Sequence, residues 1–194
     1  MTDVATLDAQ ELLHLGLYAA QRDEPQQAIE CLKRCLELNP QSAPATYMLG
    51  ALYAQIGLYD RAKLTLARAI ELNPTEHTAS FQLGLLYLTS GELELARATW
   101  SRLDVLPAEN FLNLFREGIQ ALVADEFTRC AELLARGIAA NSLNNALNDD
   151  MGRLRASAEA AAARPGTILP NAEPASPLSS GSHFLSQYRQ QSRQ

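Results

Sequence analysis

Apolar residues recur along the chain at helical spacing, and each run ends at a short polar or proline-containing break. Between Pro44 and Pro74, two such amphipathic runs flank a turn centred on Gly57. Apolar positions three and four residues apart lie on one face of an α-helix, so this stretch predicts two helices joined by a tight turn. Proline cannot continue a helix, and Pro74 ends the second one.

The same pair of helices recurs before and after this stretch without insertions. Alignment from Ala9, Ala43, His77 and Phe111 gives four repeats, each starting 34 residues after the last. The eighth position of the four repeats holds Gly16, Gly50, Gly84 and Gly118. The twentieth holds Ala28, Ala62, Ala96 and Cys130, and the twenty-fourth holds Leu32, Leu66, Trp100 and Leu134. Small residues at positions eight and twenty predict a close crossing of the paired helices, and the bulky residue is expected to fill the gap between neighbouring repeats.

This pattern resembles the tetratricopeptide repeat family over roughly residues 9–142, and the two middle repeats match it best. The resemblance implies an all-α, right-handed superhelical solenoid of four helix-turn-helix hairpins at about 9–42, 43–76, 77–110 and 111–144. The first repeat has Ala19 where the family usually has an aromatic residue. The fourth has Glu117 in place of leucine and lacks the final proline. Terminal repeats often deviate because one side faces solvent.

The segments that flank the repeats have different compositions. Residues 1–7 are expected to be a flexible N-terminus, after which Asp8 and Glu11 have the spacing of a helix-capping pair. Residues 145–163 predict a ninth helix with one apolar face, which suits a cap on the end of the solenoid. The apolar positions of that helix are Leu147, Met151, Leu154, Ala158 and Ala161.

Residues 164–194 are rich in proline and serine and predict a disordered C-terminal tail. Near its end, residues 183–189 contain Phe184, Leu185 and Tyr188, which form a candidate short linear motif for binding. The alternative is that these side chains are simply exposed, since isolated surface aromatics need no explanation.

Charge narrows the range of partners. The net charge of −6 disfavours nucleic acid, because such a partner requires a basic surface to displace counterions from its phosphates. Before Arg164 there are 13 basic and 21 acidic residues, giving −8, whereas the tail has three arginines and Glu173, giving +2. The opposite signs favour a weak attraction between the two parts. We hypothesise that Phe184, Leu185 and Tyr188 of the tail bind to the solenoid of their own chain or of a neighbouring copy and compete with the partner.

The distribution of apolar residues also bears on location. No run of about 18 apolar residues is present, so no direct membrane insertion is expected. The first residues are polar and acidic, unlike a signal peptide. An odd number of cysteines, three, fits a reducing compartment, and we expect a cytoplasmic location.

In the family that the chain resembles, the first helix of each hairpin lines a concave binding groove. The positions that would face this groove are mostly apolar, and none holds the lysine, arginine or asparagine with which some members bind a C-terminal carboxylate. The predicted groove residues are Leu13, Leu17, Tyr47, Ala51, Phe81, Leu85, Leu88, Phe115, Ile119 and Leu122. The resemblance therefore implies a protein partner that presents an apolar peptide or helix. The alternative is that some of these side chains pack between hairpins.

These observations favour a non-enzymatic adaptor, scaffold or chaperone-like protein. A second interpretation is a structural or regulatory subunit of a larger assembly, such as secretion or envelope machinery, that uses the edges of the solenoid and the tail. An enzyme or metal-dependent sensor has no motif in its favour. Neither the cysteines (Cys31, Cys35 and Cys130) nor the histidines (His14, His77 and His183) have the spacing of a metal site, and no cofactor is expected.

Overall fold

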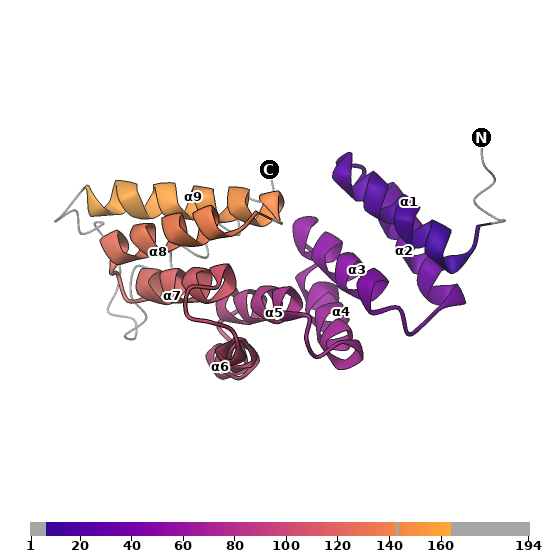
Figure 1. Ribbon diagram of the computed structural model, residues 1–194, viewed down its shortest axis with the longest axis horizontal. Helices are drawn as coiled ribbons and strands as arrows, with labels where there is room; N and C mark the ends of the chain where they lie inside the picture. Colours follow the sequence, from indigo (N-terminus) through magenta and orange to yellow (C-terminus); the bar gives the residue numbers. More distant parts are fainter. Residues whose placement is uncertain (1–6, 143, 164–194) are drawn as a thin grey trace. The chain divides into compact units, whose positions relative to one another are not determined.

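The computed structural model describes residues 7–142 and 144–163, and this part of the chain is all-α (Figure 1). Three hairpins are formed by α1 (Ala9–Gln21) with α2 (Pro25–Leu38), α3 (Ala43–Gln55) with α4 (Tyr59–Leu72), and α5 (His77–Thr89) with α6 (Leu93–Trp100). A 3-10 helix, η2 (Ser101–Val105), precedes α7 (Phe111–Val123), α8 (Phe127–Ala140) and α9 (Asn145–Ala162). The predicted all-α hairpin fold is confirmed. The predicted flexible N-terminus, apart from Leu7, and the predicted disordered tail lie outside the described residues.

The first helix begins where the sequence predicts. The Asp8 carboxylate accepts hydrogen bonds from the backbone N–H groups of Gln10 and Glu11, both at 2.8 Å. The Glu11 carboxylate in turn accepts one from the Asp8 N–H at 2.8 Å. This capping box satisfies N–H groups that have no partner inside the helix, so α1 starts at Ala9.

The four hairpin turns share one backbone conformation. At the fifteenth position of each repeat the φ angle is positive: 58° at Asp23, 78° at Gly57, 80° at Gly91 and 60° at Asp125. Glycine adopts this left-handed conformation without a steric penalty, and aspartate tolerates it better than most residues do. The turn is therefore the same in all four hairpins, although only two of them carry the glycine that marks it in the sequence.

Replacing Gly91 with alanine isolates the energetic contribution of this turn. Nothing lies within 4 Å of an added Cβ at Gly91, so only the left-handed backbone opposes the substitution. We expect Gly91→Ala to lower the free energy of unfolding by about 1 kcal/mol, measured by urea denaturation. Gly152 is the matched control because it lies inside α9 with equally open space around it. Gly152→Ala is expected to raise stability by about 0.5–1 kcal/mol, and a loss there would contradict this account.

Each hairpin closes with a bulky side chain placed over a glycine. A Cβ added to Gly16, Gly50 or Gly118 would lie within 2.9 Å of the leucine at position twenty-four of the same hairpin. At Gly84 the corresponding residue is Trp100, and the distance falls to 2.3 Å. The structure thus places this bulky residue inside its own hairpin, whereas the sequence predicted a position between neighbouring repeats.

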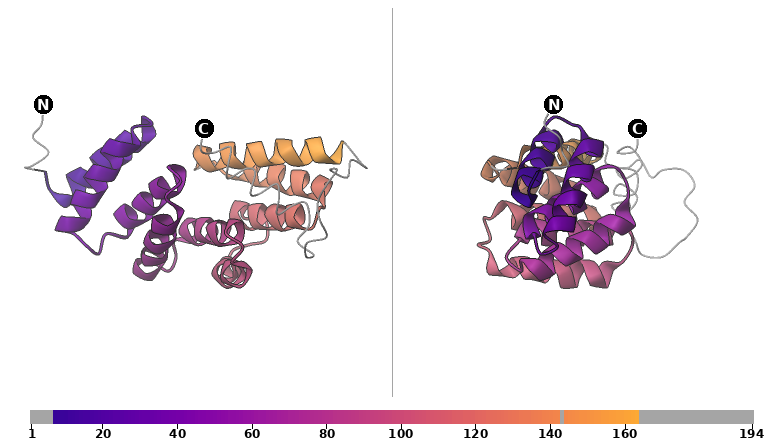
Figure 2. Two further views of the ribbon diagram at one scale, coloured as in Figure 1. Left: turned by 180° about the vertical axis from the view of Figure 1, so that it is seen from behind. Right: turned by 90° about the vertical axis from the view of Figure 1, so that its right-hand side faces the viewer.

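The chain divides into two compact units after Arg102. In unit 1, which contains α1 to α6, α2 packs on α3 and α4 packs on α5. In unit 2, α7 packs on α8 and α9 runs alongside α8 (Figure 2). The face of α9 that is buried contains Leu147, Met151, Leu154 and Ala158. The opposite face carries exposed Asp149, Arg153 and Glu159, as predicted for a capping helix.

The start of unit 2 departs from the repeat pattern at three positions. In α3 and α5, positions three, seven and ten are apolar and buried: Ala45, Leu49 and Leu52, then Ala79, Leu83 and Leu86. These residues belong to one core cluster with Leu32 and Cys35 of α2. In α7 the equivalent residues are Asn113, Glu117 and Gln120. The α7 helix therefore carries polar residues at the three positions that are apolar and buried in α3 and α5.

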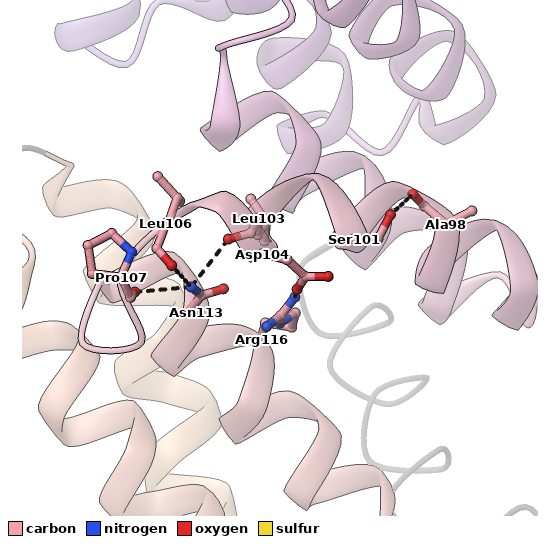
Figure 3. Close-up of polar contacts among 8 residues, drawn as sticks. All are labelled: Ala98, Ser101, Leu103, Asp104, Leu106, Pro107, Asn113 and Arg116. Atoms are coloured by element: carbon pink, nitrogen blue, oxygen red, sulfur yellow. Dashed lines mark hydrogen bonds and ion pairs between the residues drawn. The ribbon is translucent and has the colours of Figure 1, made fainter.

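Asn113, the polar residue at position three of the fourth repeat, forms hydrogen bonds with the segment that precedes α7 (Figure 3). Its side-chain amide N–H groups donate to the backbone carbonyls of Leu103, Leu106 and Pro107 at 3.1 to 3.3 Å. Arg116, one turn further along α7, pairs with Asp104 at 2.6 Å. Buried carbonyl groups need such partners, so Asn113 fixes the conformation of the entry into unit 2.

Candidate functional site

The predicted groove residues separate into two groups by burial. Four of them have no exposed surface, with relative accessibilities of 0%: Phe81, Phe115, Ile119 and Leu122. The other six are half-buried: Leu13, Leu17, Tyr47, Ala51, Leu85 and Leu88. Only the second group therefore has side-chain surface that a partner could contact in this structure. The tail residues Phe184, Leu185 and Tyr188 lie outside the described residues.

The two phenylalanines of the buried group pack inside their own hairpins. Phe81 stacks on Trp100 with ring centroids 6.2 Å apart, and the Trp100 indole N–H donates to the Phe81 carbonyl at 3.0 Å. Phe115 lies over Gly137, and its ring edge meets Phe111 at a centroid distance of 5.8 Å. A charged substitution at Phe81 or Phe115 would therefore destabilise the fold rather than report on binding.

The six half-buried residues form a surface on the first helices of unit 1, which we call the first-helix surface. They are Leu13 and Leu17 of α1, Tyr47 and Ala51 of α3, and Leu85 and Leu88 of α5. Contacts of α3 with both α1 and α5 place the three helices next to one another. Leu13 and Tyr47 also pack against the core cluster, which fixes their positions.

Polar groups gather beside Tyr47, where α3 meets the start of α5. Burial and the negative charge of Glu76 raise the pKa of the Tyr47 phenol to about 12, and a hydrogen bond with Gln82 opposes part of this rise. The Gln82 Oε1 atom is buried without a hydrogen-bond partner. Glu76 and Gln82 occupy positions outside the predicted groove set, and only the packing of α3 on α5 brings them to Tyr47. No signal in the sequence pointed to them.

Two hollows lie elsewhere on the described surface. One of about 510 Å³ is lined by residues 125–129 and Ala162, and one of about 740 Å³ is lined by residues of α2 from Gln26 to Glu37. Each is formed almost entirely by one helical segment, so neither encloses a ligand as a binding pocket normally does.

The three free cysteines are all buried. Burial raises the pKa of each thiol, and for Cys130 the pKa rises from 9.0 to about 12. The thiolate form needed for metal binding or nucleophilic chemistry is thus disfavoured. Within residues 7–142 and 144–163, no group of three or more His, Cys, Asp or Glu side chains is arranged to hold a metal ion. No helix in this part of the chain is long and apolar enough to cross a membrane.

The raised pKa of Cys130 makes stability depend on alkaline pH. Between pH 9 and 12 the thiol ionises in the unfolded chain but stays neutral in the fold, so the unfolded state gains stability as pH rises. We expect the free energy of unfolding to fall with pH more steeply in the wild type than in Cys130→Ala. The difference should approach about 1 kcal/mol per pH unit above pH 9, measured by urea denaturation at pH 8–10.5. Equal slopes would contradict the burial of a neutral thiol.

Stacked helical hairpins of this kind define a class of protein-interaction scaffolds. Residues 19–79 match the family model described as tetratricopeptide repeat, which confirms the resemblance predicted from the sequence. The chain is also similar to solved structures of MamA. One crystal structure of MamA is 26% identical, with a TM-score of 0.56, over 68% of this chain and 77% of that chain. Another, MamA 41-end from Desulfovibrio magneticus RS-1, is 16% identical, with a TM-score of 0.55, over 80% of this chain and 89% of that chain. A comparison with curated proteins finds no match.

Proposed function

We propose that the first-helix surface binds an apolar segment of another protein, either as an extended peptide or as a helix. The observation that carries this proposal is the set of six half-buried apolar side chains at repeated positions on three adjacent helices. Burial of about 300 Å² of apolar surface would contribute roughly 7 kcal/mol before the costs of ordering the partner, which suits micromolar recognition. The protein would act as a non-enzymatic adaptor or chaperone-like scaffold.

The ends of the two units favour this surface over edge-to-edge assembly. In α3 and α5, positions three, seven and ten of the repeat pack against the preceding hairpin. In α1 the same positions hold Glu11, Leu15 and Tyr18. Tyr18 is exposed and its hydroxyl accepts a hydrogen bond from Arg22 at 3.3 Å. The outer face of α9 is charged as well. Neither helix offers the continuous apolar face that a structural subunit would need at its edge.

Photo-crosslinking tests which surface meets the partner. A photoreactive amino acid at Leu85, on α5, is compared with the same amino acid at Leu64, a leucine of α4 that is 75% exposed. We expect crosslinked protein adducts from position 85 and not from position 64, and a further change of Ala51→Glu should remove them. Adducts of equal yield at both positions would count against the proposal.

The C-terminal tail is proposed as a competing ligand of the same surface. Its Phe184, Leu185 and Tyr188 supply apolar groups, and its net charge of +2 is opposite to that of the preceding residues. Deleting residues 164–194 is then expected to increase affinity for a peptide ligand, and unchanged affinity would exclude the tail as a competitor. We place this function in the cytoplasm, which the three free buried thiols favour.

A further inference from the structure

We propose that the segment bound by the first-helix surface carries a lysine or arginine beside its apolar residues, and that Glu76 receives this cation. The inference rests on the proposed function and specifies the chemistry of the partner. It concerns the site where α3 meets the start of α5, next to Tyr47 near the centre of the surface.

Comparison with the other glutamates that begin helices singles out Glu76. Glu24, Glu92, Glu126 and Glu76 each occupy the N-cap position of a helix, and none of them makes a side-chain capping hydrogen bond. Glu24 pairs with Arg22 at 3.1 Å, Glu92 with Lys63 at 2.7 Å, and Glu126 with Arg129 at 2.9 Å. Glu76 makes no ion pair with any residue of the described chain, although it is half-buried. A partly buried carboxylate is normally paired with a cation, so the Glu76 carboxylate is able to bind a cation supplied by a partner.

The neighbours of Glu76 fit a hydrogen-bond donor better than an acceptor. Its charge acts on the buried Tyr47 phenol, and the Gln82 Oε1 atom beside Tyr47 is an acceptor without a partner. An acidic ligand would be repelled by the Glu76 carboxylate, whereas an ammonium or guanidinium group can pair with it.

Within the described residues, the three helices that form this surface carry no lysine or arginine on it. All six residues of the first-helix surface are uncharged, and the positions between them on α1, α3 and α5 hold no lysine or arginine. An incoming cation would therefore bind Glu76 without displacing an existing ion pair. Apolar contacts on either side exclude water and strengthen such a pair.

Selection from a random peptide library on immobilised full-length protein tests the inference. Wild type, Glu76→Gln and a control, Glu37→Gln, which removes an exposed carboxylate on α2, are compared. Wild type and the control are expected to enrich peptides that combine two or more apolar residues with a lysine or arginine. Glu76→Gln should lose the basic preference and bind the wild-type-selected peptides about fivefold more weakly.

The outcomes separate this inference from the function on which it rests. Enriched apolar peptides that lack a basic residue, or that bind Glu76→Gln as tightly as wild type, would overturn the inference and leave the proposed function standing. Failure of the wild type to enrich any peptide would overturn both. The affinity of the selected peptides should also fall with added NaCl more steeply for wild type than for Glu76→Gln, because an ion pair is screened by salt.

Discussion

Replacing Trp100 with alanine is expected to lower the free energy of unfolding by about 3–5 kcal/mol. Trp100 is the largest side chain of the third hairpin and is 3% exposed. Its ring stacks on Phe81 and fills the space above Gly84, and its indole N–H is bonded to the Phe81 carbonyl. Alanine would leave a cavity between α5 and α6 and remove the hydrogen bond from the indole N–H to the Phe81 carbonyl, and both changes destabilise.

Urea denaturation followed by circular dichroism measures this loss. Leu64→Ala is the matched control, because it also truncates a large apolar side chain of unit 1 but at an exposed position. The control is expected to change stability by no more than about 0.5 kcal/mol. A loss below about 1 kcal/mol in Trp100→Ala would mean that the tryptophan does not close the third hairpin as described.

Replacing Gly137 with alanine is expected to destabilise unit 2 by about 1–3 kcal/mol. The added Cβ would lie 2.4 Å from Cε1 and 2.5 Å from Cδ1 of Phe115, a contact far shorter than carbon atoms accept. The Phe115 ring is fully buried, so it has no open space into which to move. Alanine favours a helix over glycine by roughly 1 kcal/mol, which offsets only part of this clash.

Thiol labelling locates this effect within the chain. Cys130 reports on unit 2, and Cys31 and Cys35 report on unit 1. In mild urea, Gly137→Ala is expected to accelerate alkylation of Cys130, read by mass spectrometry of the peptides, with little change at Cys31. An equal acceleration at all three cysteines would show that the two units unfold as one, and no acceleration would show that Phe115 yields to the new methyl group.

The 34-residue period predicted the helices because every repeat has the same local requirements. Three requirements act within one hairpin: glycine at position eight, a left-handed turn at position fifteen and a bulky residue at position twenty-four. Because each of them is local, the sequence of a single repeat is enough to predict its hairpin. The division after Arg102 was not predicted. It coincides with polar residues such as Asn113 on α7, and the bonds of Asn113 to three carbonyls depend on a fold of the preceding segment that no periodicity encodes.

The candidate site was only partly predictable for a similar reason. Tyr47 and Phe81 occupy the same repeat position, yet Tyr47 is half-buried whereas Phe81 is covered completely and stacks on Trp100. Position twenty-four holds Leu66 in the hairpin of Tyr47 and Trp100 in the hairpin of Phe81. The repeat position alone therefore does not predict how deeply the residue at position five is buried. The role proposed for Glu76 was not predicted, because it depends on the absence of an ion pair among the described residues, which only a structure can show.

The most direct test of the account is the affinity of full-length Ala51→Glu for a peptide selected on the wild type, measured by isothermal titration calorimetry. Ala51 lies on α3 between the apolar residues of α1 and α5, so a glutamate there places a charge within the proposed binding surface. We predict binding at least about tenfold weaker, a loss of 1.4 kcal/mol or more, while Leu64→Glu stays within about twofold of wild type. Wild-type affinity in a folded Ala51→Glu protein would contradict the assignment of the first-helix surface as the binding site.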